Sequence, residues 1–455
     1  MGDYETTRQR HLGYLGSILP GHVGRLRWSA EMIAQERQER LRALLRVAQE
    51  RSPWHAARLR GIDPDTFREG DLSRLPPMNK SDLMASWDAI VTDRRVTLDQ
   101  ADAHLSNLTS DAYLHDDLHV AASGGSSGHR GVFVYGWQEW ATAYVGLPRV
   151  LLWDRAVSPE LAGLPNSIGL VAAQNASHMT SSLAQTFASP EVQVACFPVT
   201  RPMSEIVAGL NAQQPTMVMG YASALALLAV EARAGRLQIA PRRVQSTGEP
   251  LLPHVRRSVE EALGAPVANV WGISEAGPMG VGCWRSPGMH LCDDLVIVEP
   301  VDQAGNPVPV GTRSDAIYVT VLTNSTLPLI RYHVTDQMTF LAEPCPCGSA
   351  HRRIADVEGR LDDIFTYAGG VTVHPHLFRS ALLKEAKLVE YQVRQTPRGA
   401  EILVIGSLRD RTSAARTLES ELSCLGVPDP SISFRPVDSF DRQPTGKVRR
   451  FLPLA

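Results

Sequence analysis

The chain has 455 residues, 44% of them hydrophobic, and carries a formal net charge of −3 with an isoelectric point near 6.5. It is too long for one hydrophobic core, so we expect one large domain and at least one smaller one. The nearly balanced charge argues against a general binder of nucleic acid or anionic lipid, because such proteins carry a strong basic field. We therefore expect no nucleic-acid partner and no membrane partner.

The N-terminus and the cysteines indicate a reducing compartment. Charged residues of both signs follow Met1, and the sequence has no run of about 18 apolar residues. Six cysteines are too few for a disulfide scaffold in a chain of this size, and clustered cysteines in a reducing compartment more often bind metal. The protein is expected to be cytoplasmic.

The first predicted element is an amphipathic helix over residues 30–51. Its apolar side chains recur near helical spacing among charged residues, and the sequence SPWH ends it. A turn-rich stretch follows, in which Asn79 or Ser81 is suited to cap the next helix.

Residues 121–131 contain four glycines and three serines. One interpretation is a flexible surface loop, since these residues are common in turns and linkers. The other is an anion cradle, because a glycine-rich turn lets backbone N–H groups and hydroxyls approach a phosphate closely. A Walker loop is excluded, since His129 and Arg130 follow Gly128 where that motif needs Lys and Ser or Thr.

Short apolar runs alternate with helix-like segments from about residue 136 to residue 245, which is typical of βαβ units. Strand patterns dominate the next part, and the final residues have alternating elements of their own. We predict an α/β protein with a large N-terminal domain over residues 1–360, made of mainly parallel sheets flanked by helices. It includes a β-rich subdomain at about residues 283–358. A small, mobile α+β domain is predicted over residues 361–455.

Seven short motifs lie along the chain in the order LPPMNKSDLM, SGGSSG, STGEP, VWGISEAG, LPLIRYHVTDQ, GRLDD and PTGKVRR. Together they resemble the adenylate-forming superfamily of acyl-CoA synthetases, nonribosomal peptide synthetase adenylation domains and luciferases, and most closely its phenylacetate-CoA ligase-like branch. Such enzymes join a carboxylate to the α-phosphate of ATP and release pyrophosphate. They then pass the acyl group to a thiol, usually that of coenzyme A.

The resemblance implies a nucleotide site and favours the anion cradle, because SGGSSG resembles the loop that holds the β- and γ-phosphates of ATP. Family members commonly continue with Lys-Pro, and here we expect Arg130 to retain the charge, with His129 as the alternative. Trp271 would face the purine, and Glu275 would bind Mg²⁺. The residues expected to bind ATP or AMP are Ser123, Gly124, Gly125, Ser126, Ser127, Gly128, Arg130, Gly248, Glu249, Pro250, Trp271, Gly272, Ser274, Asp336 and Arg360.

The resemblance also implies two catalytic residues, Lys447 and Glu275. Lys447, in PTGKVRR, would stabilise the negative charge that builds between the carboxylate and the α-phosphate. Asp362, in GRLDD, would be the hinge about which the small domain turns. Aromatic and polar residues at family-like positions favour an aryl or heteroaryl acid. The predicted acyl pocket consists of Tyr135, Asn175, His178 and Tyr221.

Each of these assignments has a plainer alternative. VWGISEAG is also compatible with a buried aromatic residue beside a helix-capping Ser-Glu pair. Asp336 and Arg360 are also compatible with surface salt bridges, and Asn175 and His178 with hydrogen-bonded residues of the core.

A metal site is predicted from clustered cysteines. CPCG supplies Cys345 and Cys347, and GCWRSPGMHLCDD supplies Cys283, His290 and Cys292. A subset of the phenylacetate-CoA ligase-like proteins has a similar pattern and carries a structural zinc, which would map to Cys283, His290, Cys345 and Cys347. Four such ligands complete a tetrahedron, so the ion would fix a β-hairpin. The alternative is reduced cysteines in apolar packing.

The sequence thus predicts an AMP-forming acid-thiol ligase that uses ATP, Mg²⁺, a structural Zn²⁺ and coenzyme A, as a monomer or homodimer. One alternative is the same adenylation followed by transfer to an amine or a carrier-protein thiol in secondary metabolism. The other is a nucleotide-binding protein without catalytic activity.

Overall fold

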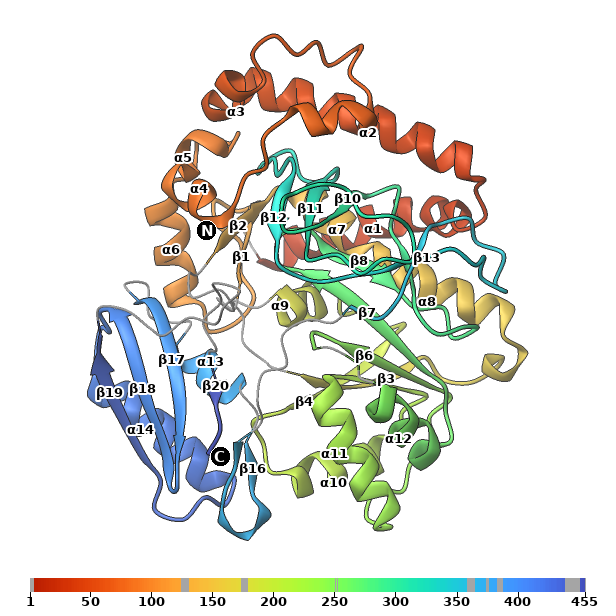
Figure 1. The fold of residues 1–455 in the computed structure, drawn as a ribbon. Coiled ribbons are helices and arrows are strands. Elements are labelled where there is room, and N and C mark those ends of the chain that lie inside the picture. The colour runs from red at the N-terminus through yellow and green to blue at the C-terminus, as the bar shows by residue number, and fades with distance from the viewer. Residues whose placement is uncertain are drawn as a thin grey trace.

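The computed structural model describes residues 4–123, 131–172, 179–249, 251, 253–357, 365–373, 376–382, 388–437 and 451–454. Within these ranges the chain is a mixed α/β protein whose largest sheet is flanked by helices (Figure 1). The predicted α/β class is therefore confirmed.

The predicted helix over residues 30–51 is present as α2 (Ala30–Arg51), and Ser29 caps it by accepting a hydrogen bond from the Met32 N–H. The sequence pattern does not indicate the helix that precedes it, α1 (Tyr4–Arg25), which is held by contacts with distant residues. Thus Tyr4 donates a hydrogen bond of 2.6 Å to Asp111.

Short helices connect α2 to the first strand. Asn79, one of the two predicted caps, accepts from the Asp82 N–H (2.9 Å), and the Asp82 carboxylate accepts from the Asn79 N–H (2.9 Å). This reciprocal pair satisfies two N–H groups that the first helical turn leaves without partners. These helices are α3 (Pro53–Arg58), η1 (Glu69–Arg74), α4 (Lys80–Ala85), α5 (Trp87–Ile90) and α6 (Leu98–Asn107).

The main sheet has nine strands in the order β13-β14-β9-β8-β7-β6-β5-β3-β4. The run from β4 to β7 is parallel, as predicted, whereas the run from β7 to β13 is antiparallel. The sheet is therefore less parallel than the sequence indicates. Its strands are β3 (Ser167–Ala172), β4 (Gln193–Pro198), β5 (Met217–Gly220), β6 (Arg243–Thr247), β7 (Val267–Ile273), β8 (Gly277–Val281), β9 (Met289–Leu291), β13 (Phe340–Leu341) and β14 (Arg353–Ile354).

The change from parallel to antiparallel occurs at the tight turn between β7 and β8. Gly277 has a positive φ of 76°. A Cβ at this position would lie 2.7 Å from the Ala143 carbonyl oxygen, so only glycine fits without displacing the backbone of Ala143. The turn presents Ser274 and Glu275 at the end of the parallel strands.

Helices pack against both the parallel and the antiparallel run of the main sheet. α10, α11 and α12 lie beside the parallel strands, and α8 lies against β8 (Figure 1). These and the neighbouring helices are α7 (Trp137–Tyr144), α8 (Gly146–Val157), η2 (Pro159–Leu161), α9 (Met179–Thr186), α10 (Met203–Gln213), α11 (Ala222–Arg233) and α12 (Pro253–Leu263).

Two smaller antiparallel sheets lie before residue 360, and the strands of one of them fall within residues 283–358, where a β-rich subdomain is predicted. β1 (His119–Ala122) pairs with β2 (Val132–Tyr135) on either side of the glycine-rich segment. The other sheet has the order β10-β11-β12. Its strands are β10 (Val296–Val301), β11 (Ala316–Val321) and β12 (Tyr332–Val334).

The C-terminal residues have a hydrophobic cluster of their own, which runs from Phe365 to Phe451. A four-stranded sheet, in the order β19-β18-β17-β20, packs with α14 in this part (Figure 1). The proposed domain boundary at residue 360 lies outside the described residues and stays a prediction. The elements are β15 (Phe365–Thr366), η3 (Ala368–Gly370), β16 (Thr372–Val373), α13 (His376–Leu382), β17 (Leu388–Thr396), β18 (Gly399–Gly406), α14 (Arg411–Cys424), β19 (Ser431–Pro436) and β20 (Phe451–Leu452).

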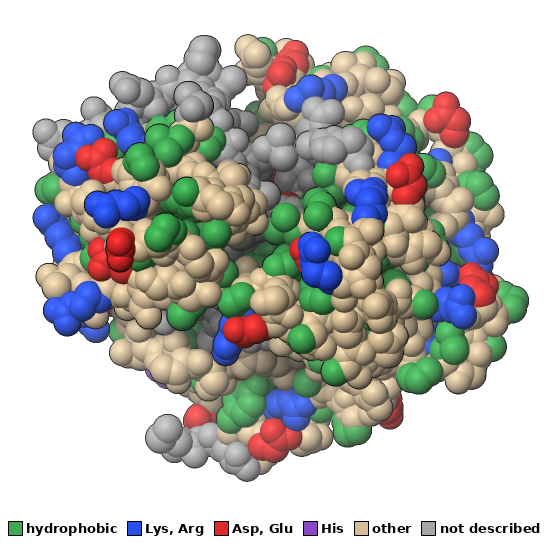
Figure 2. Space-filling view, turned by 90° about the horizontal axis from the view of Figure 1, so that it is seen from below, with side chains coloured by type: hydrophobic (Ala, Val, Ile, Leu, Met, Phe, Trp, Pro, Cys, Tyr) green, Lys and Arg blue, Asp and Glu red, His purple; other side chains and the backbone are tan. Residues whose placement is uncertain are grey.

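Acidic and basic side chains are interspersed on the face of the molecule seen in Figure 2, as the balanced composition leads one to expect. Among the described helices, none combines the length and the apolar character needed to cross a membrane.

Candidate active site

A cavity of about 630 Å³ lies where the carboxyl ends of β5, β6 and β7 meet the turn before β8. The carboxyl ends of parallel strands are where α/β proteins commonly bind ligands. One part of the wall is polar and contains Lys80, Ser123, Glu275 and Asp336. The other part is apolar and lies between α8, α9 and the strands β3 and β4.

Trp271 and Asp336 form one polar contact of this wall. Trp271 is almost wholly buried near the end of β7, and its indole N–H donates to the Asp336 carboxylate (2.9 Å). Asp336 follows β12, so the bond joins two sheets across 65 residues of sequence. It fixes one carboxylate oxygen of Asp336, which lines the cavity together with the indole.

Glu275 is the most deeply buried acid of the cavity wall, with 7% of its surface exposed. The Tyr332 hydroxyl donates to its Oε1 (3.2 Å). Burial raises the pKa of Glu275, and the positive charge of Lys80 opposes that rise. Because burial disfavours the charged carboxylate, a cation in the cavity would stabilise the ionised form of Glu275.

Tyr135 supports the turn that carries Glu275. This side chain is fully buried, and its hydroxyl donates to the Ser274 carbonyl oxygen (2.6 Å). Its predicted place in an acyl pocket is not tested by this contact and stays a prediction. Tyr221, from the same predicted set, lines the cavity and packs against Gly248, where a Cβ would lie 2.7 Å from the tyrosine ring.

The two ends of the glycine-rich segment, Ser123 and Gly131, are hydrogen-bonded to each other, and Ser123 lines the cavity. We call this pair of residues the neck of the glycine-rich segment. The Ser123 N–H donates to the Gly131 carbonyl oxygen, and the Gly131 N–H donates to the Ser123 hydroxyl oxygen, both at 3.0 Å. The Lys80 ammonium also lies 3.2 Å from that hydroxyl. The two ends of the segment are thus held together at the cavity wall.

Several predicted site residues lie outside the described part of the chain, and their roles stay predictions. Of the predicted set, the structure places Ser123, Gly248, Glu249, Trp271, Gly272, Ser274, Glu275, Tyr221 and Asp336 at the one cavity. The residues outside the described ranges are Gly124, Gly125, Ser126, Ser127, Gly128, His129, Arg130, Asn175, His178, Pro250, Arg360, Asp362 and Lys447.

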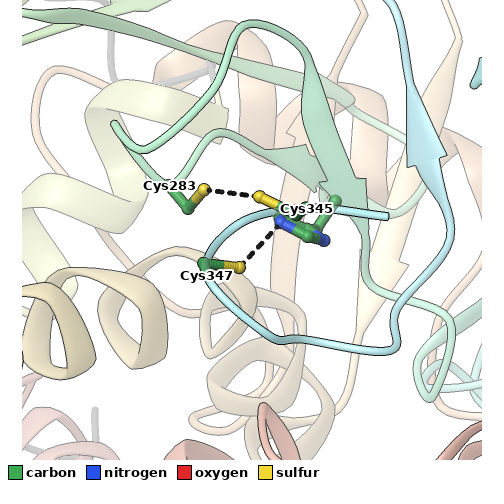
Figure 3. A group of neighbouring side chains, drawn as sticks. Cys283, Cys345 and Cys347 are labelled. Atoms are coloured by element: carbon green, nitrogen blue, oxygen red, sulfur yellow. Dashed lines mark hydrogen bonds between the residues drawn. The ribbon is translucent and has the colours of Figure 1, made fainter. Parts of the chain in front are cut away.

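The four predicted zinc ligands lie together, and Figure 3 labels the three cysteines; none of the four lines the cavity. Their ligand atoms are all within 4.8 Å of one another, with Cys283 Sγ 3.5 Å from Cys345 Sγ and Cys347 Sγ 3.3 Å from His290 Nε2. The other ring nitrogen of His290 lies 3.2 Å from the His351 carbonyl oxygen. A proton on that nitrogen leaves Nε2 available to a metal, so the donor set and its surroundings fit a tetrahedral zinc.

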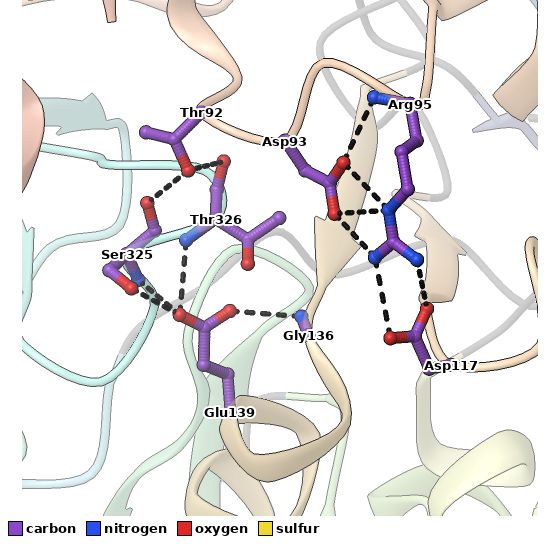
Figure 4. A network of polar contacts seen from close by, with 8 residues as sticks. All are labelled: Thr92, Asp93, Arg95, Asp117, Gly136, Glu139, Ser325 and Thr326. Atoms are coloured by element: carbon purple, nitrogen blue, oxygen red, sulfur yellow. Dashed lines mark hydrogen bonds and ion pairs between the residues drawn. The ribbon is translucent and has the colours of Figure 1, made fainter. Parts of the chain in front are cut away.

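A polar network anchors the segment that leads into β12 (Figure 4). The Glu139 carboxylate accepts from the N–H groups of Ser325 (2.8 Å) and Thr326 (3.1 Å) and, with its other oxygen, from the N–H of Gly136 (2.9 Å). One side chain therefore caps α7 and fixes the loop that precedes β12. This places the strand that carries Tyr332 and leads to Asp336.

Tyr332 and Lys80 are among the cavity residues that were not assigned a role from sequence. Tyr332 lies within LPLIRYHVTDQ, and Lys80 lies within LPPMNKSDLM, both quoted for their resemblance to family motifs. The motifs contain these positions but do not reveal their contacts. Tyr332 contacts Glu275, 57 positions away, and Lys80 contacts Ser123, 43 positions away, so neither contact produces a local sequence pattern.

No protein-family model matches the chain. A phenylacetate-coenzyme A ligase of Thermus thermophilus is 36% identical over 151 residues, which are 32% of this chain and 33% of that protein. The phenylacetate-coenzyme A ligase of Escherichia coli strain K12 is 26% identical over 79% of this chain and 78% of its own length. The crystal structure of 2-hydroxyisobutyryl-CoA ligase in complex with 2-HIB-AMP and CoA has a TM-score of 0.61 and 21% identity, covering 94% of this chain and 91% of that one.

These similarities confirm the resemblance to the adenylate-forming superfamily and to phenylacetate-CoA ligases that the motifs indicated. The chain spans about a third of the Thermus thermophilus protein in that alignment. The structural match shows that this chain has the fold of an acyl-CoA ligase.

Proposed function

We propose that this protein activates a carboxylic acid with ATP, forming an acyl-adenylate and pyrophosphate, and then transfers the acyl group to coenzyme A. The observation that carries the proposal is the arrangement of Trp271, Glu275 and Asp336 in one cavity, beside the neck of the glycine-rich segment. The similarity to phenylacetate-CoA ligases supports the same reaction class.

Each polar group of the cavity has a role in this proposal. The Trp271 indole, which lines the cavity, packs against the purine, and the Asp336 carboxylate accepts hydrogen bonds from the ribose hydroxyls. Its bond to Trp271 keeps it oriented before the nucleotide arrives. The Ser274 hydroxyl, held by the bond from Tyr135 to its carbonyl, donates toward the α-phosphate.

Glu275 is the proposed ligand of Mg²⁺. A hard divalent ion prefers carboxylate and phosphate oxygens, and this buried carboxylate has the donor that the ion requires. When bound, Mg²⁺ neutralises negative charge on the phosphates as it develops. The Tyr332 hydroxyl bond to Oε1 orients the carboxylate and leaves its other oxygen for the ion.

The acid is proposed to occupy the apolar part of the cavity. Leu147, Leu183 and Phe187 line it, together with Tyr221 near the polar end. This lining favours an acid with a sizeable apolar body, and we propose an aryl or heteroaryl acid.

The first test is pyrophosphate release. We expect it only when Mg-ATP and a suitable acid are both present, because the carboxylate of the acid is the nucleophile that attacks the α-phosphorus and displaces pyrophosphate. Each acid of a panel of aryl, heteroaryl and aliphatic acids is offered alone, with coenzyme A or with a primary amine, and the product masses identify the substrate and the acceptor. Release of ADP and phosphate would place the reaction in another class. An amide product would show that the acyl acceptor is an amine and not coenzyme A.

We also propose a structural zinc held by Cys283, His290, Cys345 and Cys347. The cluster joins the turn after β8, strand β9 and the loop after β13, so an ion there would tie three segments of the antiparallel half of the sheet. All four positions are protein ligands, which is typical of a structural site and leaves no open position for catalysis.

We expect the purified protein to contain close to one zinc per chain, measured by elemental analysis. Cys345→Ser should lose the metal and melt at a lower temperature, because the binding free energy of a structural ion contributes to folding. Cys424→Ser, an exposed cysteine on α14, is the matched control and should keep both properties. A metal-free protein of unchanged melting temperature would contradict the proposed site.

A further inference from the structure

Lys80 is a basic residue of the cavity that has no role in the function described so far. It lines the cavity together with Ser123, Glu275 and Asp336. Its ammonium lies 3.2 Å from the Ser123 hydroxyl, and its charge lowers the pKa of Glu275 against the effect of burial. Lys80 is therefore close to both the neck of the glycine-rich segment and the proposed magnesium ligand.

The backbone before Lys80 is fixed to the same strand that leads to Asp336. The Met78 N–H donates to the Arg331 carbonyl oxygen (3.0 Å), and the His333 N–H donates to the Met78 carbonyl oxygen (2.7 Å). At the next residue, Asn79, the Asn79–Asp82 pair caps α4. The flexible side chain of Lys80 thus starts from a rigid base at the cavity wall.

The composition shows that a lysine at this position is unusual for this chain. Only four of its 45 basic residues are lysines, at positions 80, 384, 387 and 447, and the others are arginines. A lysine ammonium is a compact point charge with three donors, whereas a guanidinium is larger and planar. Two of these four lysines, Lys80 and Lys447, are at the cavity and at the proposed catalytic position.

We propose that Lys80 binds the β- and γ-phosphates of ATP and stays with them as pyrophosphate leaves. The inference rests on the proposed adenylation. In that step the carboxylate oxygen bonds to the α-phosphorus, the bond from the α-phosphorus to the bridging oxygen breaks, and its electron pair leaves with pyrophosphate. An ammonium at the neck of the glycine-rich segment stabilises that charge and supplies a cation from a different part of the chain.

Lys80→Met removes the charge while keeping the length of the side chain. We expect the dissociation constant for ATP, measured by calorimetry without any acid, to rise roughly 10- to 100-fold, the usual range for loss of one charged hydrogen bond. The dissociation constant for AMP should change by less than about threefold, because AMP has no β- or γ-phosphate. Lys80→Arg should recover part of the ATP affinity.

Kinetics separate phosphate binding from a structural role. With the acid found in the panel, Lys80→Met should raise the KM for Mg-ATP, whereas thioester formation from a supplied acyl-adenylate should be unchanged. Arg74→Met removes the same charge from an exposed side chain of the same segment and should alter neither step. Equal losses for ATP and AMP, or for both half-reactions, would overturn the assignment of Lys80.

The outcomes also separate this inference from the proposed function. If wild-type protein binds no ATP, the proposed function and the role of Lys80 both fail. If wild-type protein binds ATP and releases pyrophosphate with an acid, while Lys80→Met keeps the wild-type affinity for ATP, the adenylation stands and only the assignment of Lys80 falls.

Discussion

Alanine in place of Lys447 should slow acyl-adenylate formation by about 10²- to 10³-fold, or roughly 3–4 kcal/mol, by analogy with the loss of an oxyanion-hole donor. The proposed contact forms as negative charge builds between the carboxylate and the α-phosphate, so it is strongest in the transition state. Lys447 lies outside the described residues, and the prediction rests on PTGKVRR and its resemblance to the family motif.

The measurement compares the two half-reactions. Thioester formation from a pre-made acyl-adenylate should fall much less in Lys447→Ala, because the small C-terminal domain is proposed to turn about Asp362 and present another face, including Gly369 and Gly370. Arg416→Ala, an exposed cation on α14, is the control and should leave both rates unchanged. Equal losses in both half-reactions would contradict the rotation, and undiminished adenylation would contradict the role of Lys447.

The two proposed cations act at different places in one step. Lys447 is expected to affect the rate of adenylation, and Lys80 is expected to affect mainly the affinity for ATP. Their effects can therefore be separated by measuring kcat and the KM for Mg-ATP in the same variants. If the effects of Lys80→Met and Lys447→Ala on the activation free energy add in the double variant, the two contacts are independent, since residues that share one network usually couple.

Local elements of the fold could be predicted because their causes are local. The apolar spacing and the Ser29 cap define α2, and the short alternating runs define β17 and β18. The antiparallel half of the main sheet could not be predicted in the same way, because β14 pairs with β9 across about 60 residues and both strands are very short. α1 likewise depends on distant partners such as Asp111.

The same distinction holds for the site. Motifs identified Trp271, Glu275 and Asp336 by their resemblance to a known family, but the sequence does not reveal that Trp271 holds Asp336 through its indole N–H. The four zinc ligands were predicted from the resemblance to relatives that carry a structural zinc, and the structure brings all four side chains together. The contact of Lys80 with Ser123 depends on how the segment before α4 pairs with β12, which only the three-dimensional arrangement shows.

Arg149→Met should be among the most destabilising single substitutions in the chain. The Arg149 guanidinium on α8 is 1% exposed and donates to both carboxylate oxygens of Asp294 (2.9 and 2.8 Å), which is itself fully buried. Arg25 of α1 adds a longer contact to Asp294 (3.3 Å). Removing Arg149 leaves a buried carboxylate with too little positive charge around it, so we expect a loss of about 3–5 kcal/mol in the free energy of unfolding.

The pH dependence gives a second readout of the same pair. Burial alone would raise the pKa of Asp294, but the charge of Arg149 and the contact with His22 hold it well below its usual value. A lowered carboxyl pKa contributes stability above the ordinary pKa of the unfolded chain, and this contribution is lost as the pH falls toward the lowered value. In Arg149→Met the pKa should rise, so acid unfolding should begin at a higher pH than in the wild type.

Urea unfolding at neutral pH and acid titration followed by circular dichroism measure both effects. Arg46→Met, which breaks the exposed pair with Asp65, is the matched control and should cost less than about 1 kcal/mol. The double variant Arg149→Met with Asp294→Leu should regain much of the lost stability, because it removes the unpaired charge that makes the single variant costly. A single variant as stable as the control, or a double variant no more stable than the single one, would show that the buried pair does not hold α8 to the segment before β10.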